Sequence, residues 1–197
     1  MTLKTPTNLI ECPTRADWRE WLSNNYATER NVWLKIYKKT SPTPSVTYDE
    51  AVDEELCFGW IDSLAQKGDD QYYTQFFAKR NAKSRWSRVN KDKVEKLTAA
   101  GLMTDAGQVM IDLAIRTGTW TALDEVENLV APPDLQESLD ANPVAKEYFT
   151  AFPRSVKRGI LEWLLTAKTP ATRAKRIGSI VTLAERNERA NQYRTKA

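Results

Sequence analysis

Hydrophobic and polar positions alternate with a period of two over residues 31–38. Val32, Leu34 and Ile36 fall on one face, and the other face carries aromatic and charged side chains. Such alternation is typical of a strand that buries one face. The pattern therefore predicts a strand here.

Before this strand the hydrophobic period is that of a helix. Trp18, Trp21 and Leu22 recur at i, i+3 and i+4 spacing. Thr14 precedes them, and a threonine hydroxyl can cap the first turn of a helix. We expect a helix from Thr14 to about Asn24.

A second helix is predicted after a proline-containing loop over residues 40–45. Thr47 and Glu50 have the spacing of a capping box, in which a hydroxyl and a carboxylate satisfy exposed amides of the first turn. The helix that they open is acidic and should end near Gly59.

Two strands and two helices complete this part of the chain. Residues 60–67 and 72–79 flank the turn-forming residues 68–70, which favours an antiparallel hairpin. Further helices are expected from Ser87 to Gly101 and from Thr104 to Gly118, by their caps and closing glycines. The predicted element order is α-β-α-β-β-α-α.

The region after Pro132-Pro133 has a purely helical pattern. Its prolines occur where helices can begin. Two apolar stripes mark amphipathic helices, one with Val156, Ile160, Trp163, Leu164 and Ala167, the other with Ala174, Ile177, Val181 and Ala184. We expect an α+β domain over residues 1–131 and an all-α module over 132–197, with a frayed polar tail of about ten residues.

Composition favours a cytoplasmic location. The chain has 197 residues, of which 41% are hydrophobic, enough for a substantial core. Its N-terminus has no apolar stretch of a signal peptide, and we expect no membrane insertion. Cys12 and Cys57 form no CxxC pair, so neither a disulfide framework nor a zinc site is indicated.

The sequence contains no histidine, the usual general base and the commonest metal ligand. Histidine-dependent triads and histidine–metal sites are therefore excluded. Its seven glycines form neither GxGxxG nor GxxxxGK[ST], which excludes Rossmann and P-loop nucleotide sites. We expect no cofactor, no metal, and binding in preference to catalysis.

Two segments, residues 48–63 and 84–90, resemble the YdeI/OmpD-associated family. Members of this family are described as bacteriocin-protection or stress-resistance proteins. Residues 132–135 and 172–177 are similar to the helical module of that family. Relatives usually carry an Arg-Phe-Thr-Pro-Arg-like stretch where this chain has Gln75 to Lys79, so its ligand preference can differ. The resemblance implies resistance to bacteriocins, antimicrobial peptides or envelope stress, and no particular reaction.

The candidate binding site lies around the turn at Gly59 and the segment that follows the hairpin. Aromatic faces, an arginine and a helix N-terminus suit a small anionic or polymeric ligand. The residues expected to contribute are Trp60, Asp62, Ser63, Tyr73, Arg80, Trp86, Ser87 and Asn90. The alternative is a structural role, with Trp60 in the core and Asp62 bound to local amides or an arginine.

Two other functions remain open from the sequence. Residues 79–96 contain eight basic side chains near aromatic ones, which suits weak nucleic-acid binding through Arg85, Arg88 and Lys91. In the structural alternative Phe76 and Trp86 belong to the core and the charges solvate a helix. The third possibility is a histidine-free enzyme that uses Asp62 with Tyr73 or a lysine.

The acidic helix allows two interpretations. Its carboxylates, with those of Asp69 and Asp70, could bind a hard or iron cation through oxygen ligands, as in domains likened to frataxin. We expect instead a solvated helix face. Cys57 lies among acidic residues that disfavour its thiolate, so we expect a buried thiol and no nucleophile.

Overall fold

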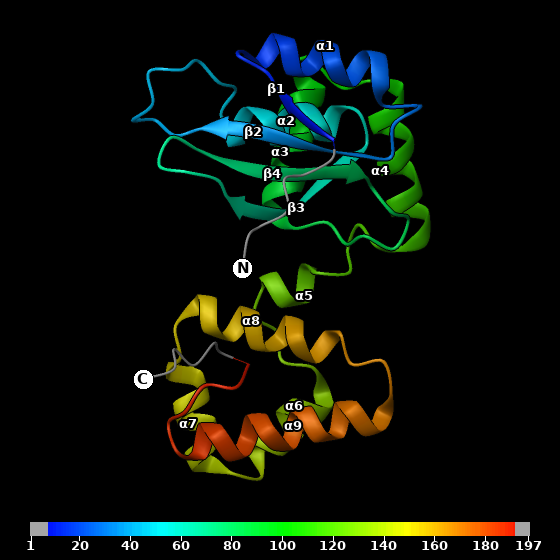
Figure 1. Cartoon of the computed structure of the whole chain (residues 1–197). Coiled ribbons are helices and arrows are strands. Elements are labelled where there is room, and N and C mark those ends of the chain that lie inside the picture. The colour runs from blue at the N-terminus through cyan, green and yellow to red at the C-terminus, as the bar shows by residue number, and fades with distance from the viewer. Residues whose placement is uncertain (1–7, 192–197) are drawn as a thin grey trace. The chain divides into compact units, whose positions relative to one another are not determined.

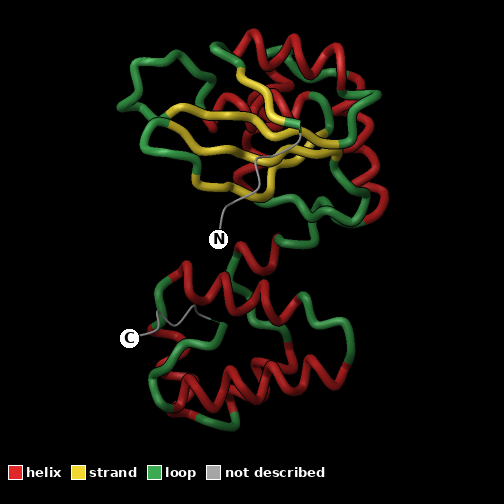
Figure 2. The backbone as a smooth tube through the Cα atoms, in the orientation of Figure 1, coloured by secondary structure: helices red, strands yellow, loops and turns green. Residues whose placement is uncertain are grey.

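The computed structural model describes residues 8–191 and divides after Thr121 into two compact units. Figure 2 shows that the strands are confined to the first unit, whereas the second unit is made of helices and loops. The predicted α+β class is confirmed. The frayed tail that the sequence predicts lies largely outside the described residues. Within residues 8–191 no helix is long and apolar enough to cross a membrane.

A four-stranded sheet with the order β1-β2-β4-β3 forms the first unit. Strand β2 (Asn31–Tyr37) pairs antiparallel with β4 (Tyr72–Lys79), which pairs antiparallel with β3 (Trp60–Lys67). Val32, Leu34 and Ile36 of β2 are buried, so the alternation identified its inner face correctly. The hairpin of β3 and β4 also has the predicted bounds.

Strand β1 (Leu9–Glu11) was not predicted, so the element order α-β-α-β-β-α-α lacks its first strand. It has three residues and pairs parallel to β2, with Ile10 opposite Leu34. A strand this short has too few positions for an alternating pattern. Its pairing depends on a partner more than 20 residues away along the chain.

Four helices accompany the sheet, and α2 and α3 lie behind it in the view of Figure 1. Each begins at the predicted cap, because the side chains of Thr14, Thr47, Ser87 and Thr104 accept backbone N–H groups of the following turn. The helices are α1 (Arg15–Asn25), α2 (Tyr48–Cys57), α3 (Arg88–Ala99) and α4 (Asp105–Thr117).

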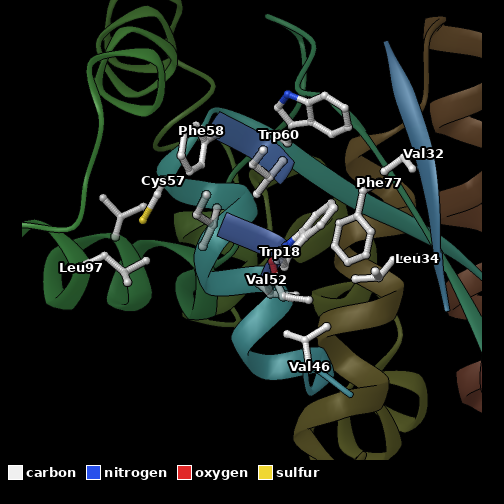
Figure 3. Packing of buried hydrophobic residues seen from close by; sticks show 14 of the residues in the cluster. Trp18, Val32, Leu34, Val46, Val52, Cys57, Phe58, Trp60, Phe77 and Leu97 are labelled. Carbon is white, nitrogen blue, oxygen red and sulfur yellow. The ribbon is translucent and has the colours of Figure 1, made fainter. Parts of the chain in front are cut away.

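The core of the first unit lies between the sheet and these helices. Trp18 is fully buried, its ring lies 5.2 Å from that of Phe77, and its indole N–H donates to the carbonyl of Ala51. Figure 3 shows Trp60 at one end of this cluster, with its indole nitrogen on the side away from Trp18 and Phe77. Strand β3 is irregular here, because its pairing with β4 shifts register between Asp62 and Ala65.

The second unit has its own core, built by helices α5 (Asp124–Glu127), α6 (Pro133–Asp140), α7 (Pro143–Ala151), α8 (Arg154–Leu165) and α9 (Pro170–Glu185). The predicted boundary at 131/132 falls inside this unit, between α5 and α6. The stripe on α8 is buried at Val156, Ile160 and Leu164. On the α9 stripe Ala184 is buried and Ile177 and Val181 pack against this core, whereas Ala174 is exposed and the buried Ile180 was not included in the prediction.

Candidate functional site

A tight turn at Gly59 joins α2 directly to β3. Gly59 has φ +70°, and a Cβ atom there would lie 2.7 Å from Cγ of Met110 and 2.8 Å from the carbonyl oxygen of Ala106. A side chain is therefore disfavoured by both the backbone conformation and the lack of space. Because the turn is so short, the last turns of α2 face the first residues of β3. This brings Glu55 close to Asp62.

Asp62 lies on the inner side of β3 and is held by two donors. Its Oδ2 accepts a hydrogen bond of 2.7 Å from the Tyr48 hydroxyl and one of 3.3 Å from Nε2 of Gln75. Burial, and then the hydrogen bond to Asp62, raises the pKa of Tyr48. Gln75 is buried and belongs to this polar cluster.

Arg80 is the cation of the site and is only 5% exposed. Its guanidinium carbon lies 3.7 Å from the centre of the Trp86 ring, and Nη1 makes a 3.5 Å hydrogen bond to the carbonyl of Arg85. Nε and Nη2 meet no acceptor among residues 8–191, and we call them the open edge of Arg80. Burial lowers the pKa of Arg80 to about 10, while Glu55 and Asp62 act in the opposite direction.

Glu55 was missed as a site residue. Its side chain is completely buried, and neither carboxylate oxygen has a hydrogen-bond partner in the described part of the chain. The backbone amide of Asp62 faces this open carboxyl group without completing a hydrogen bond of ordinary geometry. Burial, and then the charge of Asp62, raises the pKa of Glu55 well above 4.5, although Arg80 favours the ionised form.

An open cleft of about 400 Å³ lies beside the turn at Gly59. Its lining includes aromatic and charged residues, among them Tyr26, Phe58, Trp60, Lys79, Arg80 and Asp105. Trp60 is 1% exposed, and its buried indole N–H finds no acceptor among the residues that the structure describes. Two residues of the cleft thus carry three buried donors that the fold leaves unsatisfied.

The two units of the chain match different family models. Residues 10–110 match the model of a domain of unknown function, DUF8412, which spans half of the chain. The chain belongs to the DUF8412 family. Residues 128–187 match the model described as bacteriocin-protection, YdeI or OmpD-associated, which confirms the resemblance over that part and associates the chain with bacteriocin protection. Searches of curated proteins and of solved structures gave no match.

The DUF8412 domain brings some of the predicted site residues together. Trp60 and Arg80 line the same cleft, Arg80 stacks on Trp86, and Asp62 interacts electrostatically with Arg80. Tyr73 lies on β4 and pairs with Lys67 of β3. Burial raises the pKa of the Tyr73 hydroxyl.

Ser63, Ser87 and Asn90 have other surroundings in the DUF8412 domain. Ser63 is exposed and lies in the irregular part of β3, so it does not face inward with Asp62. The Ser87 hydroxyl accepts the backbone N–H of Asn90 as the cap of α3. The anion-binding capacity of this helix start is therefore partly used within the fold.

The basic stretch over residues 79–96 does not form one surface. Arg80 is buried, and Lys93 bonds to Asp49 and Asp53 at 2.7 and 2.6 Å. Trp86 is 1% exposed, which matches the structural alternative, whereas Phe76 packs on Trp33 outside the main core cluster. Arg85, Arg88 and Lys91 lie in the segment that leads into α3 or on its first turn.

The expectation of a solvated acidic face on α2 was wrong. Glu54 is 1% exposed and accepts hydrogen bonds of 2.6 and 2.5 Å from Arg15 and Arg19 of α1. Asp49 and Asp53 bond to Lys93 of α3 and Glu54 bonds to α1, so these carboxylates hold the helix against its neighbours and are not available to a cation. Over residues 8–191 no group of three or more acidic or cysteine side chains is arranged to hold a metal ion.

Cys57 is buried, as expected. Burial, and then the charge of Glu54, raises the pKa of its thiol to about 11. The thiolate that a nucleophile requires is therefore scarce near neutral pH. Cys57 packs between α2 and α4, and its backbone carbonyl accepts a hydrogen bond from the Thr104 hydroxyl.

Proposed function

We propose that this chain is a non-catalytic binding protein in bacteriocin, antimicrobial-peptide or envelope-stress resistance, and that its DUF8412 domain binds a small anionic ligand at Arg80. The match over residues 128–187 supports the resistance role. The ligand is argued from the site alone. We further propose that the protein acts in the cytoplasm, which fractionation of cells expressing the tagged full chain would test.

The open edge of Arg80 is the observation that carries this proposal. Nε and Nη2 present two parallel N–H groups, the arrangement that pairs bidentately with a carboxylate or phosphate. Stacking on Trp86 holds the guanidinium plane in place before any ligand arrives. The indole N–H of Trp60, on the same cleft, supplies a further donor.

Leaving such groups unsatisfied is costly, since each buried donor without an acceptor destabilises a fold by about 1–3 kcal/mol. A ligand that carries acceptor oxygens recovers this free energy on binding. The aromatic side chains of Tyr26, Phe58 and Trp60 suit an apolar or aromatic ligand body. Binding is favoured over catalysis because Asp62, the residue that a histidine-free enzyme would use, already accepts hydrogen bonds from Tyr48 and Gln75.

Calorimetric titration of the full chain with benzoate, and with uncharged benzamide as a comparison, tests the proposal. We expect benzoate to bind, benzamide to bind at least tenfold more weakly, and Arg80→Met to lose benzoate binding. Arg85→Met is the matched control, because the hydrogen bond from Arg80 goes to the backbone carbonyl of Arg85, which the substitution keeps. Equal affinity of wild type and Arg80→Met for benzoate would refute the site, as would complete absence of binding by small carboxylates.

A further inference from the structure

An open groove with a volume of about 640 Å³ lies between α6 and α9 in the second unit. Its floor is apolar, because Ile177 and Val181 of α9 pack on the core below and stay half-exposed to the groove. The α9 residues that line it run from Pro170 to Thr182, which spans about 18 Å at the rise of a helix. The groove is therefore long enough for about three turns of another helix.

Gly178 keeps the middle of this floor low. It lies inside α9 without a positive φ, and a Cβ atom there would meet no other atom within 4 Å. Glycine is a poorer residue than alanine in the interior of a helix. Neither the backbone conformation nor the packing within residues 8–191 requires it at this exposed position. The missing side chain leaves space for close approach by another molecule.

The charge of the groove comes from its α6 wall. Arg173 of α9 donates two hydrogen bonds to Asp134, at 2.5 and 2.7 Å, and so neutralises that carboxylate. Glu137 is exposed, and its carboxylate has no hydrogen bond or ion pair with any other described residue. Because Arg173 is the one basic side chain in the described lining, Glu137 leaves the groove with an unbalanced negative charge.

The surroundings of the α6 wall are acidic as well. Residues 122–151, which include α5, α6 and α7, hold seven acidic side chains against one basic side chain, Lys146. Lys146 is itself in an ion pair. Lys175 and Arg176 of α9 are outside the groove lining. A partner that lies along α6 is therefore favoured if it is positively charged.

We propose that this groove binds a cationic amphipathic helix of another polypeptide. Apolar anchors at i, i+3, i+4 and i+7 of the partner fill the floor, and lysines on its polar face meet the α6 wall. A second copy of the chain fits less well, because in a symmetric pair each copy offers the other the same hollow. The inference goes beyond the anionic site at Arg80. Antimicrobial peptides include helices of this kind, and only that biological link rests on the resistance function proposed above.

Fluorescence anisotropy of labelled peptides titrated with the full chain tests the proposal. The probe is a peptide of about 18 residues, or five helical turns, with leucines at amphipathic spacing and lysines elsewhere. We expect it to bind about tenfold more tightly than the same peptide with glutamates for lysines, and than a scrambled peptide of equal composition. Equal binding of all three, or no binding of the leucine–lysine peptide, overturns the groove and leaves the benzoate test of Arg80 intact.

Paired substitutions locate the bound peptide. Glu137→Lys should weaken binding about tenfold, whereas Glu147→Lys makes the same charge change on the exposed surface of α7, outside the groove, and should not. Gly178→Leu should fill the floor and abolish binding, and Gly159→Leu on α8, where a Cβ atom also has open space, is its control. Leucine favours a helix more than glycine does, and thermal melts check that each variant folds. Unchanged affinity in either groove variant, or an equal loss in its control, overturns the proposal.

Sedimentation velocity of the full chain tests the other occupant, a second copy. We expect Gly178→Leu to leave the mass of the protein in solution unchanged, because no copy of the chain occupies the groove. A wild-type dimer that Gly178→Leu dissociates would assign the groove to self-association, and this result would overturn the peptide proposal.

Discussion

Replacing Glu55 by glutamine should change how the stability of the first unit depends on pH. Because burial raises the pKa of Glu55 in the folded protein above its ordinary value of 4.5, the folded state holds a proton that the unfolded state has lost. The contribution of Glu55 to stability is therefore full below about pH 4.5 and declines as the pH rises toward the folded pKa.

The magnitude follows from this one proton. In that window the wild type loses about 1.4 kcal/mol of unfolding free energy per pH unit on account of Glu55. Glutamine cannot ionise. The unfolding free energy of Glu55→Gln minus that of the wild type should therefore rise by about 1.4 kcal/mol per pH unit from pH 5 upward. Any constant effect of the buried amide cancels in this slope.

Urea unfolding followed by tryptophan fluorescence at several pH values between 3 and 8 measures the difference. Glu50→Gln is the control on the same helix, because hydrogen bonds from Thr47 lower the pKa of Glu50. Its stabilising contribution is present above pH 4.5 and lost on acidification, so the stability difference between Glu50→Gln and wild type should be constant from pH 5 to 8 and change only below about pH 4.5. A stability difference between Glu55→Gln and wild type that is constant from pH 5 to 8 would refute a neutral Glu55.

Three further predictions concern reactivity, packing and nucleic acid. Alkylating reagents should modify native Cys57 far more slowly than a free thiol, and fast labelling at pH 7 would contradict its burial. Gly107→Ala should destabilise the first unit by about 1–3 kcal/mol, because a Cβ there would lie 2.4 Å from the carbonyl oxygen of Cys57, while Gly159→Ala, which has open space, should not destabilise in thermal melts. If α3 binds nucleic acid, reversing the charges of Arg85 and Arg88 should abolish a salt-sensitive gel shift without changing the melting temperature; no shift at low salt removes that function.

Local patterns were sufficient to predict most of the first unit. The alternation over residues 31–38 and the caps at Thr14, Thr47, Ser87 and Thr104 each depend on side chains that are close in sequence. Strand β1 could not be found in this way, because three residues carry no period and its partner strand is distant.

The candidate site was only partly accessible to the same reasoning. Asp62, Arg80 and Trp86 were chosen because a glycine turn and an aromatic-basic segment suggested convergence. Glu55 was overlooked because a run of carboxylates on a helix usually faces water. Its burial is set by how α2 packs on the sheet and α3, which no spacing within the helix reveals.

The register shift in β3 has a consequence for how the protein behaves in a crowded solution. β3 is an outer strand, and a regular outer strand offers N–H and C=O groups to which another chain can add. The irregularity between Asp62 and Ala65 interrupts that template near the middle of the strand, and the opposite outer strand, β1, spans only three residues. Both margins of the sheet are thus poor seeds for intermolecular strand addition, which protects an aromatic-rich domain against aggregation.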